Sequence, residues 1–207
     1  MLCPTDADGS NPECDLAPHV INNSWTNGVR SNEFQASVDA WRAAGIVPIF
    51  AAGNRGPNCG TVTSPGDFKN VIGVGAVESD DKLWSGSGRG AGHDGVRKPD
   101  VTAPGKDIRS AWNSGIPAYF TATGTSMATA HVSGAVALYL SKHKGATYDN
   151  VYSAITYMSA DTSGLTPEKK NCGGLLDTGY PNNSYGWGRI NAARALGVTN
   201  NSPSNHS

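Results

Sequence analysis

One segment of this chain, residues 124–138, is almost free of charged side chains and dense in alanine, glycine and valine. A helix with so little polar surface has to be buried among other elements, and its small residues let neighbouring backbones approach closely. Ser126 stands where the preceding loop is expected to enter this helix. The segment therefore predicts a buried core helix with a serine at its N-terminus.

The N-terminus of such a helix suits a nucleophilic serine. Unsatisfied backbone N–H groups and the positive end of the helix dipole lie where an oxyanion would form. The alternative interpretation is that Ser126 is an ordinary N-cap residue in front of a core helix, which is the commoner role of such serines. The residues around Ser126 decide between these two interpretations.

The letters G-T-S-M-A over residues 124–128, followed by H-V-S-G over residues 131–134, resemble the serine motif of the subtilisin-like proteases, or subtilases. Ala130 stands where that motif usually has proline, which should change local rigidity rather than chemistry. The resemblance implies an α/β fold with a mostly parallel central sheet, helices on both faces, and a serine endopeptidase activity with Ser126 as nucleophile. It implies no required cofactor; structural calcium is compatible with the family, but no site can be assigned.

A second motif, A-A-G-N over residues 51–54, resembles the oxyanion motif of the same family and follows a nearly all-apolar stretch. The resemblance makes Asn54 the side-chain oxyanion donor. An amide NH2 is neutral and donates a hydrogen bond without titrating, so it can stabilise a negative oxygen at any working pH. Gly-Asn after a strand is also ordinary turn chemistry. The presence of both motifs in the family's order favours the oxyanion interpretation.

The stretch from residue 15 to residue 25 resembles the bacillopeptidase F branch of the subtilases. The resemblance implies that residues 24–26 form an extended edge that pairs with the substrate backbone. Thr26 stands where the family usually has glycine, and its side chain is expected to narrow the cleft. The residues predicted to line the cleft are Ser24, Trp25, Thr26, Ala51, Ala52, Gly53, Gly124 and Thr125.

Apolar periodicity and turn residues predict the remaining elements. Ser31 is expected to cap a helix that ends at Gly45, and Pro48 inside the following strand requires a bulge or an unpaired position. Thr147 or Asp149 is expected to cap a helix with Val151, Ile155 and Met158 on its apolar face. Strands are predicted at residues 20–25, 46–52, 71–76 and 98–105, a surface hairpin at 78–95, a long polar loop at 160–184, and a last helix opened by the motif at 185–193.

Composition limits the classes of function. The net charge of −1 and the 16% of charged residues argue against nucleic-acid and membrane-surface partners. No stretch approaches the ~20 apolar residues of a membrane span, and no signal peptide follows Met1. We expect residues 1–198 to form a partial subtilisin-like peptidase domain and residues 199–207 to form a disordered tail.

The four cysteines show no CxxC spacing, so they do not suggest a zinc site. They allow up to two disulfides in any of three connectivities. Four N-x-S triplets, which begin at Asn22, Asn182, Asn200 and Asn205, are compatible with a secretory route. An extracellular location is expected mainly from the family resemblance.

The aspartate and histidine motifs of the subtilases are missing. Family members carry them upstream of the serine, each in its own glycine-flanked motif, and neither occurs before Ser126. His131 belongs to the serine helix and is expected in the helix packing, whereas His19 and His93 are expected at the surface. We therefore expect a fragment that needs a missing N-terminal segment or propeptide to act on polypeptide substrates. The alternative is a degenerate, non-catalytic peptide-binding protein.

Overall fold

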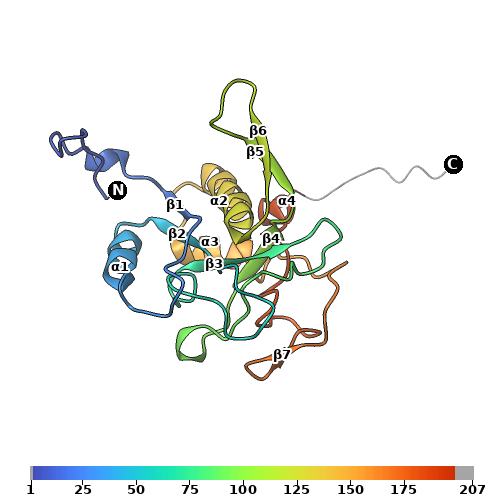
Figure 1. Cartoon of the computed structure of the whole chain (residues 1–207). Coiled ribbons are helices and arrows are strands. Elements are labelled where there is room, and N and C mark those ends of the chain that lie inside the picture. Colours follow the sequence, from blue (N-terminus) through green and yellow to red (C-terminus); the bar gives the residue numbers. More distant parts are fainter. Residues whose placement is uncertain (1, 199–207) are drawn as a thin grey trace.

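The computed structural model describes residues 2–198, and its centre is a sheet of four parallel strands (Figure 1). Every residue of the two middle strands is buried, as expected of apolar strands covered on both faces. The strands lie side by side in chain order: β1 (Val20–Asn23), β2 (Val47–Ala51), β3 (Ile72–Val77) and β4 (Val101–Pro104).

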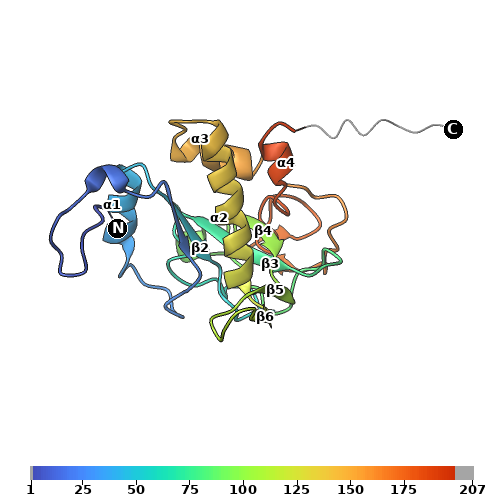
Figure 2. The ribbon, with the colours of Figure 1, turned by 90° about the horizontal axis from the view of Figure 1, so that it is seen from above.

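Helices cover both faces of the sheet, so the predicted α/β architecture is confirmed. Ile49 and Phe50 are neighbours on β2 and therefore point to opposite faces. Ile49 packs with Val132 of the long helix α2, which contacts all four strands, and Phe50 packs with Val38 of α1 (Figure 2). The shorter helices α3 and α4 pack against α2. The helices are α1 (Gln35–Ala43), α2 (Thr125–Lys142), α3 (Tyr148–Ile155) and α4 (Ala192–Ala195).

The two edges of the sheet differ. Along β4, the N–H of Thr102 donates to Gly188 O at 2.8 Å, and the N–H of Ile190 donates to Thr102 O at 2.8 Å. Within residues 2–198, no comparable backbone partner lies along the outer side of β1. The chain therefore covers one edge of its sheet itself and leaves backbone groups free along the other.

Pro48 is tolerated in a central strand because its nitrogen faces an unpaired position. The N–H of Val47 donates to His19 O on the β1 side, so the nitrogen of Pro48 points to the β3 side. Pairing with β3 begins only one residue later, between Ile49 and Ile72. The predicted unpaired position is thus confirmed.

Two of the predicted helix ends differ from the structure. Ser31 is not a cap: α1 begins at Gln35 after a turn, its N-cap Phe34 makes no side-chain cap bond, and Ser31 N–H donates to Ser64 Oγ at 2.9 Å. Thr147 does cap α3, in a capping box with Asn150. Met158 lies beyond the end of that helix and is exposed, so its predicted place on the apolar face is wrong.

The predicted surface hairpin at residues 78–95 is confirmed over residues 78–82, a largely exposed turn between Val77 and Leu83, and is wrong beyond it. One antiparallel bridge, Val77 to Leu83, opens the segment, and residues 87–90 are then buried. The N–H of Gly88 donates to Gly53 O at 2.8 Å, and a Cβ atom on Gly88 would lie 2.7 Å from Ala52 O. This glycine-rich loop is inside the molecule because it packs directly on the end of β2.

Smaller elements complete the described chain. Disulfides join Cys3 to Cys14 and Cys59 to Cys172, which selects one of the three connectivities. The predicted loop at 160–184 contains the short hairpin of β7 (Asn171–Cys172) and β8 (Leu175–Leu176). The other small elements are the hairpin of β5 (Ile108–Ala111) and β6 (Tyr119–Ala122) and the 3-10 turns Cys14–Leu16 and His93–Gly95.

No helix within residues 2–198 is long and apolar enough to cross a bilayer. The tail predicted at residues 199–207 lies outside the described residues.

The packing of Gly88 gives a stability prediction with an internal control. Gly88→Ala would force backbone atoms apart, and we expect the free energy of unfolding to fall by roughly 1–3 kcal/mol. Gly134, on α2, has no atom within 4 Å of its Cβ position. Gly134→Ala should therefore raise the free energy of unfolding by roughly 0.5–1 kcal/mol. Urea denaturation of both variants measures this, and equal effects would contradict the buried position of the glycine-rich loop.

Candidate active site

Ser126 is the second residue of α2, and its side chain faces the end of β1. Its Oγ donates to Ser24 O at 2.9 Å, and Ser24 Oγ donates back to Ser126 O at 2.9 Å. In the first turn of the helix, Thr125 N–H donates to Asn54 Oδ1 and Met127 N–H donates to Gly124 O at 3.1 Å, whereas Ser126 N–H has no partner within residues 2–198. Ser126 is half-buried, so its hydroxyl lies at the surface of a rigid element.

The side chain of Asn54 is held by the residue that precedes Ser126. Asn54 Oδ1 accepts hydrogen bonds from Thr125 N–H at 3.0 Å and from the Thr125 hydroxyl at 2.8 Å. Thr125 Oγ1 in turn accepts from Gly53 N–H at 3.2 Å. Because the amide oxygen is engaged twice, the NH2 group points the other way, and it lies 3.2 Å from the Cβ position of Gly124. The exposed Asn54 amide thus has its donor free beside the turn that leads to Ser126.

The residues predicted to line the cleft fall into two groups. Ser24, Trp25 and Thr26 are partly or well exposed, and the Trp25 ring meets Phe34 and Phe50 edge-on at 5.1 Å and 5.4 Å between centroids. The second group is buried behind them and supports the surface from within: Ala51, Ala52, Gly53, Gly124 and Thr125.

Contacts between residues 24–29 and residues 53–64, which we call the two walls of the predicted cleft, were not predicted. Arg55 Nη1 donates to Gly28 O at 2.7 Å, and the N–H of Asn27 donates to Ser64 O at 3.0 Å. Thr63 lies beneath them, with Oγ1 at 3.2 Å from the Cβ position of Gly53. The position of Arg55 directly after the A-A-G-N motif was the one available signal, and nothing in the sequence marked Thr63.

No histidine within residues 2–198 hydrogen-bonds to the Ser126 hydroxyl, which donates to Ser24 O. His131 is exposed, with Nδ1 at 2.9 Å from Met127 O one turn earlier, so its predicted place in the helix packing is wrong. His19 is exposed, and the His93 side chain is 34% exposed, as expected of surface residues.

No group of three or more His, Cys, Asp or Glu side chains within residues 2–198 is arranged to hold a metal ion.

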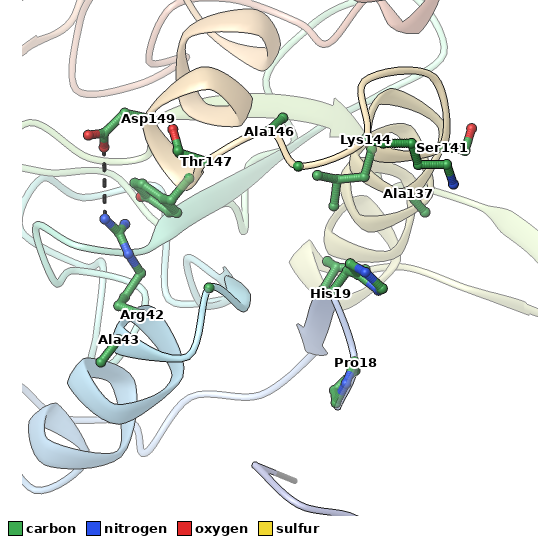
Figure 3. Close-up of a pocket in the computed structure, with 15 residues that line it drawn as sticks. Pro18, His19, Arg42, Ala43, Ala137, Ser141, Lys144, Ala146, Thr147 and Asp149 are labelled. Carbon is green, nitrogen blue, oxygen red and sulfur yellow. Dashed lines mark ion pairs between the residues drawn. The ribbon is translucent and has the colours of Figure 1, made fainter. Parts of the chain in front are cut away.

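A cavity of about 750 Å³ lies at the other end of α2 (Figure 3). It is lined by the chain before and at the start of β1, by the C-terminal end of α1, and by Ala137 and Ser141 of α2. An ion pair of 3.8 Å between Arg42 and Asp149 borders it. Ser141 lies about 22 Å along the helix from Ser126, from the rise per residue of an α-helix. This cavity is therefore separate from the Ser126 region.

The serine and oxyanion motifs are thus brought together by contacts between the ends of β1 and β2 and the start of α2. The sequence model of the subtilase family matches residues 7–188. This chain belongs to the subtilase family. The match confirms the resemblance drawn from the motifs.

Three relatives illustrate the similarity. Bacillopeptidase F of Bacillus subtilis is 34% identical over 95% of this chain and 13% of the relative. Serine protease AprX of Bacillus subtilis is 41% identical over 56% of this chain and 30% of the relative. Subtilisin E of the same species is 39% identical over 67% of this chain and 36% of the relative. The aligned part of this chain therefore spans little more than a third of these relatives at most.

The hydrogen bonds of Thr125 can be tested without any assay of activity. Thr125→Val keeps the shape of the side chain but removes the hydroxyl that holds Asn54 and accepts from Gly53 N–H. We expect the free energy of unfolding to fall by roughly 1–3 kcal/mol, since a buried donor loses its partner. We also expect the NMR signals of the Asn54 NH2 group to shift or broaden. Thr125→Ser, which keeps the hydroxyl, is the control; unchanged Asn54 signals in Thr125→Val would contradict the role of Thr125.

Proposed function

We propose that this chain carries the nucleophile and the oxyanion site of a serine endopeptidase that cleaves polypeptides through an acyl-enzyme. The observation that carries the proposal is the fixed orientation of Asn54, whose NH2 group is free beside Gly124, in the turn that leads to Ser126. Ser126 Oγ attacks the carbonyl carbon of the scissile bond. Asn54 Nδ2 and the Ser126 N–H donate to the oxygen that becomes negative, where a preorganised donor stabilises the transition state most.

The attack needs a base that accepts the Ser126 proton. In this chain the hydroxyl donates to Ser24 O, and a backbone carbonyl does not take up a proton at neutral pH. We propose that an aspartate and a histidine come from a separate polypeptide segment, in the family's order upstream of Ser126. The histidine would then replace Ser24 O as the partner of the hydroxyl.

A surface beside Ser126 is suited to such a segment. Helix α2 runs along β1, because Ser126 bonds to Ser24 and, two turns later, Ser133 Oγ donates to Asn22 Oδ1 at 2.8 Å. On this helix, four exposed residues follow helical spacing, and we call them the α2 stripe: Ala130, Gly134, Ala137 and Leu138. The stripe, the free edge of β1 and the cavity of Figure 3 adjoin one another. A segment that adds a strand to β1 and packs apolar side chains on the stripe would cover all three.

A second function has one specific observation in its favour. The reciprocal bonds between Ser24 and Ser126 satisfy the hydroxyl without any base. A protein that binds extended peptides along residues 24–26 and never cleaves them would have the same arrangement. This non-catalytic peptide-binding function is the alternative to the endopeptidase.

We also propose an extracellular location. The two disulfides favour an oxidising compartment. The N-x-S triplet at Asn182 does not support this location, because Asn182 is buried and its Nδ2 donates to Asp177 O and Gly179 O.

Labelling with a fluorophosphonate separates the two functions. The purified 207-residue chain should react slowly, and its peptide hydrolysis should lie about 10⁶-fold below that of an intact subtilase, the loss known for removal of the histidine in subtilisin. Adding an upstream segment that carries the aspartate and histidine motifs should accelerate both. If the segment binds but neither labelling nor hydrolysis rises, the non-catalytic function is favoured.

The docking surface has its own matched variants. Gly134→Leu fills open space on the α2 stripe and should abolish the gain from the added segment while leaving the chain folded. Ser37→Leu places the same side chain at an exposed position of α1, on the opposite face of the sheet. This variant should keep the gain in activity from the added segment. Equal gains in both variants would contradict docking along the stripe.

A further inference from the structure

The space beside Gly53, between the two walls of the cleft, is already filled. A Cβ atom built on Gly53 would lie 3.2 Å from Thr63 Oγ1 and 3.8 Å from Thr26 Cγ2. The first distance is a tight contact and the second is an ordinary van der Waals contact. Thr63 is 7% exposed and Gly53 is buried, so the floor of this space is closed.

The walls are also tied together, which prevents them from separating to admit a larger group. The N–H of Asn27 donates to Ser64 O at 3.0 Å, and the N–H of Ser64 donates to Val29 O at 2.9 Å. At the rim, Arg55 Nη1 donates to Gly28 O at 2.7 Å. These three bonds join the segment that carries Thr26 to the segments that carry Thr63 and Gly53.

Gly53 itself is held in place from both sides. Its N–H donates to Thr125 Oγ1 at 3.2 Å, and its carbonyl oxygen accepts from Gly88 N–H at 2.8 Å. The same Thr125 orients Asn54, so a displacement of Gly53 would disturb the amide that faces the reacting carbonyl. A bulky group can therefore enter beside Gly53 only by disturbing the oxyanion site.

We propose that this cleft selects polypeptides with a small side chain, that of glycine, alanine or serine, on the residue that contributes the scissile carbonyl. The proposal rests on the proposed function, because it assumes that the substrate carbonyl lies between Ser126 and Asn54 and that the side chain of the same substrate residue lies beside Gly53, as the family resemblance implies. The Thr26 methyl group and the Thr63 hydroxyl occupy the room that a leucine or phenylalanine side chain needs. Thr26 is thus a specificity-determining residue.

Peptide boronic acids test the selectivity on the 207-residue chain itself. Their trigonal boron atom accepts the Ser126 oxygen as a fourth ligand while the hydroxyl proton passes to water or to an added base. Ac-Ala-Ala-Pro-boroAla and Ac-Ala-Ala-Pro-boroPhe then place an alanine or phenylalanine side chain beside Gly53. We expect the alanine compound to bind at least about tenfold more tightly by titration calorimetry, since one extra methylene group alone changes discrimination by about 10–200-fold. Equal or tighter binding of the phenylalanine compound would overturn the selectivity.

Variants of Thr26 assign the effect to its side chain. Thr26→Gly and Thr26→Ala remove the methyl group that faces Gly53 and should lower the preference for alanine severalfold or reverse it. Thr26→Val keeps both branches and should keep the preference, while melting temperatures confirm that each variant is folded. An unchanged preference in the folded glycine and alanine variants would overturn the role of Thr26. If neither compound binds the folded wild-type chain, with or without the added upstream segment that carries the base, the proposed cleft fails together with the selectivity, whereas a preference for phenylalanine leaves the proposed function standing.

Discussion

Helix α2 has almost no polar face, and its burial on the sheet determines where Ser126 lies. Ala128, Val132 and Val136 are fully buried, and the helix touches all four strands. In a parallel sheet the carboxyl ends of the strands lie at the same end of the sheet, where α/β proteins bind their ligands. Because α2 runs antiparallel to β1, its N-terminus lies at that end of the sheet. The serine therefore meets the residues that follow β1 and β2.

Thr125 converts this general placement into a specific geometry. Its backbone N–H and its hydroxyl both engage Asn54, and its oxygen accepts from Gly53, so one buried side chain joins the loop after β2 to the start of α2. A net contribution of about 1 kcal/mol is typical of each such bond. The larger effect is on orientation, since an amide held only by its backbone would turn its oxygen and its NH2 group toward Ser126 with comparable ease.

The elements that the sequence predicted correctly are those whose signal is local. The apolar runs of β2 and β3 and the uncharged segment of α2 are recognisable in short windows, because burial on all sides leaves no room for polar residues. The serine and oxyanion motifs were recognised by resemblance. Their hydrogen bonds are observed in the structure, while their catalytic roles stay predictions.

The features that the sequence did not predict depend on partners distant along the chain. Residues 84–90 have the glycine and serine content of an exposed loop, yet Gly88 is buried because it bonds to Gly53. Ser31 has the residue type of an N-cap, but its N–H bonds to Ser64, and α1 starts later. The exposure of His131 could not be inferred either, since it depends on which side of α2 the sheet leaves open.

The proposed upstream segment would meet α2 on its open side. Gly188 and Ile190 cover the β4 edge, so the uncovered apolar and backbone groups concentrate along β1 and the α2 stripe. Exposed alanine and glycine permit close approach of another backbone, which a stripe of long polar side chains would prevent. One strand-forming segment along β1 would satisfy the free edge, bury the stripe and end next to the Ser126 hydroxyl. If that segment carries the proposed base, completing the sheet and completing the catalytic group are the same structural event. The hydrogen bond from Ser126 to Ser24 O is then compatible with the proposed endopeptidase.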